Sequence, residues 1–143
     1  MLKTLSPLLS ADLLYHLCAM GHGDEIAIVD GNFPAASCAR NLVVTPGLDA
    51  TQILDAVMSV FPLESAHTAA FHMAQVDNPD IKPAICEDFS TILNAHEGTV
   101  VALQGLERYA FYERVKCAYL VVSTTEARLY GNIILTKGVI APQ

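Results

Sequence analysis

The sequence predicts one α/β domain over residues 1–143, in which helices cover both faces of a mixed, mainly parallel sheet and so form three layers. Short apolar runs alternate with segments of helical periodicity, which is the pattern of this fold class. No repeat, low-complexity tract or linker divides the 143 residues, and this length suits a single domain with a sizeable core. The last two predicted strands follow each other closely, like a hairpin, so we expect an antiparallel pair within the sheet.

The N-terminal elements are marked by capping and turn residues. Ser10 can cap a helix, and Gly21 is expected to end that helix in the left-handed conformation. Glu25–Asp30 is an apolar run that ends at a carboxylate, which predicts a buried strand. Residues 30–37 are rich in turn formers and predict a loop. A short strand at 42–44 follows, and a Pro–Gly pair stops it.

The remaining elements follow the same alternation. Asp49 and Gln52 have the spacing of a capping box and open the next helix. After it we expect a strand at 68–74, a loop at 78–83, a helix that ends near Gly98, a strand at 99–103, a short helix at 107–116, and strands at 118–123 and 131–136.

Charge and composition exclude several classes of function. The formal net charge is −7 and the eight Lys and Arg residues are scattered, which argues against nucleic-acid binding. Residues 1–9 are not a secretory signal, and no apolar run approaches the roughly 20 residues of a membrane helix. The widely spaced cysteines are typical of buried thiols in a reducing compartment: Cys18, Cys38, Cys86 and Cys117. We therefore expect a cytoplasmic protein that binds neither nucleic acid nor a membrane.

The surface is expected to be poor in charge. Hydrophobic residues make up 52% and charged residues 16% of the chain, whereas typical domains have about 45–50% and about 25%. Part of the surface is then expected to be buried against copies of the same chain, which predicts a homo-oligomer.

His22 lies between two glycines and is the first candidate for chemistry. The flanking glycines let the backbone approach a ligand closely, and an imidazole suits proton donation and acceptance near neutral pH. The alternative is structural, because a histidine is also favourable in a loop at the negative end of a helix.

Asp30 and Arg108 both follow predicted strands, and functional groups of open α/β sheets gather outside the carboxyl ends of strands. Asp30 can bind ligand hydroxyls, orient a base or ligate a metal, or it serves its own turn. Arg108 offers a fixed fork of donors at a helix start, where a cation opposes the helix dipole. Its alternative is an amphipathic helix whose Phe111 and Tyr112 face the core while Arg114 is solvated.

Tyr130, Gly131 and Asn132 form a third candidate group just before the last strand. The tyrosine offers a hydroxyl and a ring face, and the asparagine offers a donor and an acceptor. A simple turn explains the glycine and asparagine equally well. The remaining histidines, at 16, 67, 72 and 96, lack the spacing of a zinc or carboxylate-assisted metal site, so we expect neither a metal nor another cofactor.

Five blocks of the sequence resemble the fucose mutarotase branch of the ribose pyranase and fucose mutarotase family. They run in the family's order over nearly the whole chain, and residues 48–98 match only in pattern. The blocks are Met1–Leu8, M-G-H-G-D-E-I at Met20–Ile26, D-G-N-F-P-A at Asp30–Ala35, F-Y-E-R at Phe111–Arg114, and Y-G-N-I-I-L-T-K-G-V at Tyr130–Val139. The second and fifth blocks are specific.

The resemblance implies a cofactor-independent isomerase that interconverts the α and β anomers of a free monosaccharide, L-fucose or a related sugar. It implies that His22 is the catalytic proton donor and that Asp30, Arg108, Tyr130, Gly131 and Asn132 bind the sugar. The ribose-handling branch has a histidine at the position of Arg108, so this arginine favours a fucose-like substrate. Gly31–Asn32 departs from the Ala-His of some bacterial relatives.

The site is expected to be shared between subunits. His22 precedes the strand at 25–29 and Asp30 follows it, and a strand of that length holds its ends well over 10 Å apart, at about 3.3 Å per residue. The resemblance points the same way, toward ring-like homo-oligomers with sites at subunit boundaries.

Two other classes of function stay open. A sugar-binding or transport accessory module would use the same polar residues without turnover. A metal-dependent sugar isomerase would contain a metal and convert an aldose into a ketose.

Overall fold

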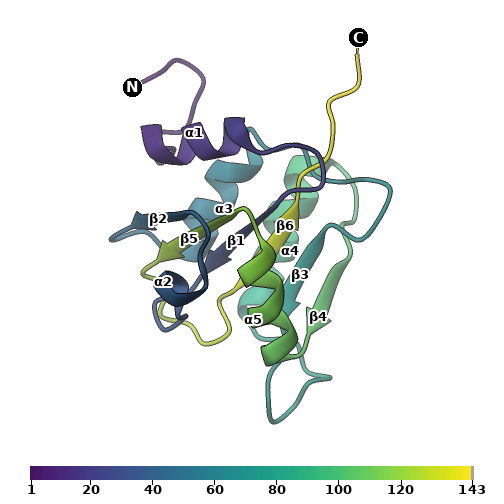
Figure 1. Ribbon diagram of the computed structural model, residues 1–143. Coiled ribbons are helices and arrows are strands. Elements are labelled where there is room, and N and C mark those ends of the chain that lie inside the picture. The colour runs from purple at the N-terminus through teal and green to yellow at the C-terminus, as the bar shows by residue number, and fades with distance from the viewer. Residues whose placement is uncertain (143) are drawn as a thin grey trace.

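A six-stranded sheet in the order β2-β5-β1-β6-β3-β4 forms the middle of the computed structural model, which describes residues 1–142 (Figure 1). Strand β6 runs antiparallel to its neighbours β1 and β3, whereas the pairs β1–β5, β2–β5 and β3–β4 are parallel. The predicted mixed, mainly parallel sheet is confirmed. The strands are β1 (Glu25–Val29), β2 (Leu42–Thr45), β3 (Ala70–Met73), β4 (Leu103–Leu106), β5 (Leu120–Thr124) and β6 (Ile133–Thr136).

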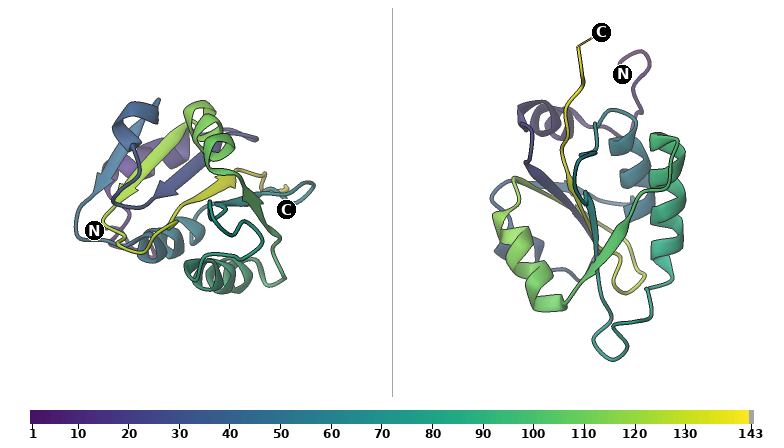
Figure 2. Two further views of the ribbon diagram at one scale, coloured as in Figure 1. Left: turned by 90° about the horizontal axis from the view of Figure 1, so that it is seen from below. Right: turned by 90° about the vertical axis from the view of Figure 1, so that its right-hand side faces the viewer.

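Helices cover both faces of this sheet, as expected for three layers. Figure 2 shows α3 and α4 on one face and α5 on the other, and the short α2 lies beside α5. Figure 1 shows α1 across the end of the sheet near which both termini lie. The helices are α1 (Ala11–Ala19), α2 (Ala35–Cys38), α3 (Ala50–Met58), α4 (Ile85–Glu97) and α5 (Arg108–Cys117). Among residues 1–142, none of the helices has the length and apolarity needed to cross a bilayer.

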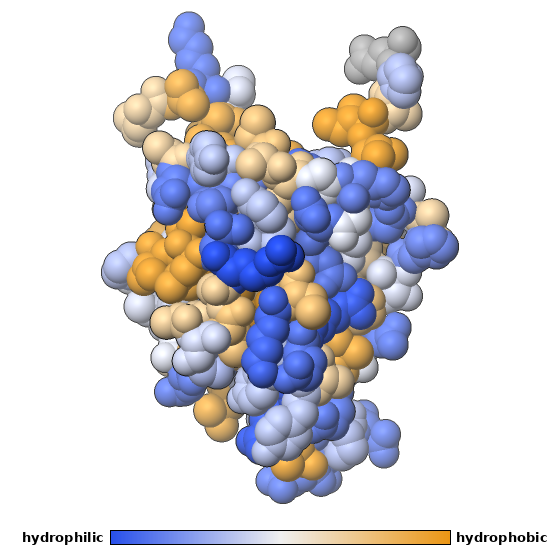
Figure 3. Space-filling model, viewed as in Figure 1, coloured by the Kyte–Doolittle hydropathy of each residue, from blue (hydrophilic) through white to orange (hydrophobic). Residues whose placement is uncertain are grey.

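Exposed apolar residues gather near the two chain ends. Leu2 and, near the other end, Val139 and Ile140 are largely exposed. Figure 3 shows both terminal segments protruding from the same end of the molecule with apolar residues on them, while polar residues run down over α5.

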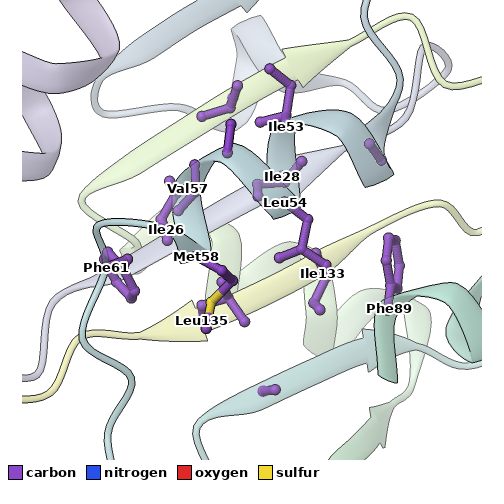
Figure 4. Close-up of a cluster of buried hydrophobic side chains, with 14 of the residues drawn as sticks. Ile26, Ile28, Ile53, Leu54, Val57, Met58, Phe61, Phe89, Ile133 and Leu135 are labelled. Carbon is purple, nitrogen blue, oxygen red and sulfur yellow. The ribbon is translucent and has the colours of Figure 1, made fainter. Parts of the chain in front are cut away.

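Two hydrophobic clusters fill the spaces between the layers. Along β1, Ile26 and Ile28 point into the cluster under α1, α3 and α4, and Ala27 and Val29 point into the cluster under α2 and α5. Figure 4 shows the first cluster, where α3 packs its apolar side onto β1 and β6. Burial of both faces explains why these strands are continuous apolar runs in the sequence.

The predicted helix caps are largely confirmed. The Ser10 side chain accepts from the backbone N–H of Leu13, and Asp49 and Gln52 form both bonds of a capping box. Gly98 ends α4 with φ 67°. Gly21, however, does not end α1 in the left-handed conformation, because its N–H donates to the Asp24 carboxylate and forms a turn in which Gly23 has φ 85°.

The expected hairpin between the last two strands is wrong, because β1 lies between β5 and β6. Both edges of β5 are already paired with the parallel strands β1 and β2, so the chain must cross the carboxyl end of β1 before it can pair again. The crossing is held by bonds from the Thr124 hydroxyl to the Val29 carbonyl and from the Gly31 N–H to the Glu126 carbonyl.

Three smaller expectations also fail. The strand predicted at 99–103 lies at 103–106, because the Asn94 side chain binds the Val101 N–H and pairing with β3 begins at Leu103. The loop predicted at 30–37 runs into the short helix α2. Two of the four free cysteines, Cys18 and Cys117, are exposed because they lie on the outer sides of α1 and α5.

Candidate functional site

Asp30 and Asn132 form the centre of a polar cluster at the carboxyl end of β1. Because β1 and β6 are antiparallel, the residue after β1 lies beside the residue before β6. The Asp30 N–H donates to the Asn132 amide oxygen over 2.8 Å, and the Asn132 amide donates to the Asp30 carboxylate over 3.0 Å. Asp30 is 5% exposed and Asn132 is 2% exposed. These two buried polar groups satisfy one another and hold each other in place.

A cleft of about 240 Å³ opens beside this pair. Its size is below the roughly 300–1,000 Å³ of sites for drug-sized ligands, which suits a smaller molecule. The cleft brings together four of the predicted site residues, which come from three separate parts of the chain. Its lining comprises Asp30, Asn32, Phe33, Met73, Arg108, Tyr112, Leu129, Tyr130 and Asn132.

Arg108 contributes a donor without a partner. It is the first residue of α5, and the Glu107 side chain caps that helix by accepting from the N–H groups of Tyr109 and Ala110. The Arg108 Nε is buried and makes no hydrogen bond to any group of residues 1–142. Its Nη2 donates to the Tyr109 hydroxyl over 3.1 Å, which raises the pKa of the guanidinium. Because buried N–H groups are nearly always paired, the free Nε is available for an acceptor on a bound molecule.

The Tyr130–Asn132 run has a special backbone. Tyr130 has φ 61°, an uncommon value for a residue with a side chain. A Cβ on Gly131 would lie 2.6 Å from the Glu126 Cγ and 3.0 Å from the Arg128 carbonyl oxygen, so this position requires glycine. Gly131 does not line the cleft. It lets the loop pack closely enough to present Tyr130 and Asn132 there.

An ion pair that sequence reasoning missed supports this loop. The Glu126 carboxylate accepts from Nε and Nη2 of Arg128, both over 2.9 Å, and also from the Arg128 backbone N–H. Arg128 in turn binds Asp88 of α4 over 2.7 Å. Glu126 is 4% exposed, and its bonds to Arg128 lower the pKa of its carboxyl. The only local signal is an acidic and a basic residue two positions apart in a loop.

The structure extends one expectation about α5 and corrects another. Tyr112 is half-buried: it packs against the hydrophobic cluster that contains Phe111, and it also lines the cleft and stacks edge-on to Phe33 with ring centroids 5.2 Å apart. Arg114 is not merely solvated. Its guanidinium forms a forked pair with Glu25 and lies 3.8 Å from the ring centroid of Phe71.

His22 lies at the opposite end of β1, away from the cleft. The Gly23 N–H donates to the Lys137 carbonyl just beyond the far end of β6, so the glycine-flanked loop does not fold back along the strand. The five residues of β1 span about 17 Å at about 3.3 Å per residue. The His22 side chain is 59% exposed, and its Nε2 lies 2.6 Å from Oε2 of Glu64. Within one chain, the structure does not bring His22 to Asp30 and Arg108.

Glu64, which lies beside His22, is a second residue that sequence reasoning missed. Hydrogen bonds from the Ala66 N–H, His22 and the Ser65 N–H lower the pKa of its carboxyl to about 2. The carboxylate is therefore ionised at neutral pH. Nothing in the local sequence marks it, because its partner is 42 residues away.

A larger hollow of about 720 Å³ lies between residues 63–69 and 97–102. None of the buried polar side chains of residues 1–142 lines it, whereas Asp30 and Asn132 both line the smaller cleft. Sites for small ligands combine a cavity with a few converging polar groups. We therefore take the smaller cleft as the candidate binding site.

Two of the other histidines are bound to neighbouring groups of the chain. His96 binds Asp55 over 2.8 Å, and His72 is buried with its Nδ1 3.1 Å from the Met73 carbonyl. Burial lowers the pKa of His72. Across residues 1–142, the structure gathers no three His, Cys, Asp or Glu side chains in an arrangement that would hold a metal ion.

Comparison with known proteins gives consistent matches along the chain. Residues 3–140 match the family described as the RbsD / FucU transport protein family. The chain is 42% identical to the human fucose mutarotase, over 98% of this chain and 95% of that protein. It is 40% identical to the fucose mutarotase of Streptococcus pneumoniae, solved in complex with L-fucose, with a TM-score of 0.91 over 98% of this chain and 100% of that one.

A second solved structure extends this agreement. FucU from Bifidobacterium longum is 37% identical and superimposes with a TM-score of 0.90, over 97% of this chain and 100% of that one. The sequence matches and the superpositions therefore agree over almost all of the chain, and the chain belongs to the RbsD/FucU family.

Proposed function

We propose that this protein is a mutarotase that interconverts the α and β anomers of a free monosaccharide, L-fucose or a close relative, without a cofactor. The observation that carries the proposal is the unpaired Nε of Arg108 in a small cleft beside the buried Asp30–Asn132 pair. The identities of 42% and 40% to fucose mutarotases, one of them solved with L-fucose, support the same substrate class.

The cleft offers the groups that a pyranose needs. The Asp30 carboxylate accepts from sugar hydroxyls, and Arg108 donates from Nε to a ring or hydroxyl oxygen. The rings of Phe33 and Tyr112 provide apolar surface for a sugar face. Tyr130 and Asn132 also line the cleft. The family resemblance implies a histidine at the position of Arg108 in the ribose-handling branch, so this arginine favours a fucose-like sugar.

The reaction needs only proton transfers. One proton leaves the anomeric hydroxyl and one reaches the ring oxygen, the bond from C1 to the ring oxygen breaks, and an open-chain aldehyde forms. Rotation about the C1–C2 bond and ring closure give the other anomer. We assign proton donation to His22, and one positioned acid or base typically contributes about 10²–10⁴-fold.

We propose further that the site forms between two copies of the chain, with His22 from one and the cleft from the next. The span of β1 keeps them apart within one chain, and a homo-oligomer removes this obstacle. The exposed apolar residues at both chain ends and the low charge content provide surface for such contacts. Four free cysteines among the described residues suit a reducing compartment, so we place the protein in the cytoplasm.

Saturation-transfer NMR with free sugars tests the proposed function. We expect exchange between the anomers of L-fucose to exceed exchange in buffer, and to exceed the acceleration seen with D-ribose. Exhaustive dialysis against a strong chelator is expected to leave the rate unchanged. Binding of L-fucose without acceleration would identify a sugar-binding module, and a ketose product that depends on a divalent ion would identify an isomerase of a different class.

A further inference from the structure

The Tyr130 hydroxyl is bound by the loop that joins β3 to α4. Its oxygen accepts from the Val76 N–H over 3.2 Å, although the two residues are 54 positions apart in the sequence. Figure 1 shows this loop at the end of the molecule opposite the two chain termini. The loop and the Tyr130–Asn132 run therefore meet beside the cleft.

Bonds within the loop fix the Val76 N–H in place. At the start of the loop, the Ala74 N–H donates to the Leu106 carbonyl over 2.8 Å and so continues the pairing of β3 with β4. The Gln75 side chain then donates to the Ile81 carbonyl over 3.0 Å and closes the loop on itself. Val76 comes directly after these two anchored residues, so its N–H offers a hydrogen bond at a defined position.

The Tyr130 side chain is half-buried, and its ring packs against the hydrophobic cluster under α2 and α5 while it lines the cleft. A phenol hydroxyl both donates and accepts hydrogen bonds. Val76 uses this hydroxyl as an acceptor, and no group among residues 1–142 accepts the hydroxyl proton. The proton is therefore free for an acceptor outside the chain.

Val76 itself does not line the cleft. It lines a neighbouring cavity of about 310 Å³, and Arg108 lines both spaces. Val76 therefore acts on a molecule in the cleft through the Tyr130 hydroxyl. Hydrogen bonds in a chain polarise one another, so the bond accepted from Val76 strengthens the bond that Tyr130 donates.

We propose that the Val76 N–H is a positioning group of the sugar site: it holds the Tyr130 hydroxyl oxygen and so directs the hydroxyl proton to an oxygen of the bound sugar. This inference rests on the proposed function, and it makes the loop between β3 and α4 part of the site. Tyr130 contacts the sugar, and Val76 acts through Tyr130.

An amide-to-ester replacement at residue 76 isolates this bond. The α-hydroxy acid with the side chain of valine removes the N–H and keeps both the side chain and the loop. We expect the Kd for L-fucose to rise roughly 2- to 12-fold, the equivalent of one hydrogen bond. In a Tyr130→Phe background, which lacks the hydroxyl, the same replacement should cause no further rise in Kd.

The matched control is the same ester replacement at Asp77. The Asp77 N–H makes no hydrogen bond to any group of residues 1–142, so this control should bind L-fucose with the parent Kd. Both replacements also weaken the preceding carbonyl as an acceptor, and the control measures that effect by itself.

A spectroscopic measurement separates positioning from a general loss of structure. Carbon-13 NMR of protein labelled at the tyrosine Cζ atoms reports the hydrogen bonds of each hydroxyl. Saturation with L-fucose should shift the Tyr130 signal of the parent, and the ester at residue 76 should shift this signal before any sugar is added. The signal of Tyr15, an exposed residue of α1, should stay unchanged in both cases.

Two results would overturn the proposal. One is a folded protein with the ester at residue 76 that binds L-fucose with the parent Kd. The other is a parent protein whose Tyr130 signal does not move on saturation with L-fucose, and this measurement needs no variant. Absence of accelerated exchange in the parent would instead reject the proposed function, and it is measured separately from Kd, so the two failures are distinguishable.

Discussion

Replacing His22 by glutamine is expected to lower accelerated anomer exchange by about 10²–10⁴-fold, the usual contribution of one acid or base. Glutamine has similar length and its amide can still donate to Glu64, but it cannot take up or release a proton at neutral pH. The side chain is 59% exposed and belongs to neither hydrophobic cluster, so its loss removes no core packing. The free energy of unfolding should change by no more than about 0.5 kcal/mol.

Saturation-transfer NMR on the variant, with circular dichroism and urea unfolding beside it, measures both quantities. The control is His67→Gln, an exposed histidine of the neighbouring loop that is not in contact with the cleft. That control should keep the parent rate. A folded His22→Gln variant with near-parent exchange would remove His22 from the mechanism.

Replacing Glu126 by alanine is expected to cost about 3 kcal/mol of unfolding free energy, because it removes the acceptor of several groups at once. The Glu126 carboxylate accepts from the Arg128 guanidinium and backbone N–H and from the Ala50 N–H at the start of α3. The loop then loses the contact that packs against Gly131. Because that loop presents Tyr130 and Asn132, affinity for the sugar should fall as well.

Urea unfolding and sugar titration measure these two effects of Glu126→Ala. The matched control is Glu113→Ala, which breaks an exposed pair with Lys116. Exposed pairs contribute only about 0–1 kcal/mol, so this control should unfold and bind sugar almost as the parent does. Equal unfolding midpoints for the two variants would show that the Glu126–Arg128 pair does not support the loop.

Local sequence patterns predicted most of the fold. The apolar run of β1, the capping box at Asp49 and the glycine after α4 each depend on a few neighbouring residues, and all appear where expected. The order of strands depends on which edges are free, and no local pattern records that β5 already has two partners. The hairpin prediction failed for this reason.

The candidate site likewise contains residues that local sequence predicted and residues that it did not. Asp30 and Arg108 follow strand ends, so a general rule about α/β sheets placed them at one edge. Their convergence in one cleft agrees with that rule, and their roles in binding stay predictions. Glu64 and Glu126 were not predicted, because their importance depends on contacts with His22 and Arg128 that only the folded chain shows. Gly138 lacks a side chain and so allows the close approach to the Leu63 backbone that brings Glu64 to His22, but a lone glycine does not reveal that contact in the sequence.

The shared site is the central claim, and subunit complementation tests it most directly. His22→Gln removes the proton donor, and Arg108→Ala removes a half-buried side chain whose Nε makes no bond within the described chain. Each variant alone should be nearly inactive. In an equal mixture after subunit exchange, half of the boundaries receive an intact His22 and half an intact cleft, so about one quarter receive both. The account predicts that anomer exchange recovers to about one quarter of the parent rate. Verified subunit exchange without recovery, or a fully active monomer of the parent, would contradict it.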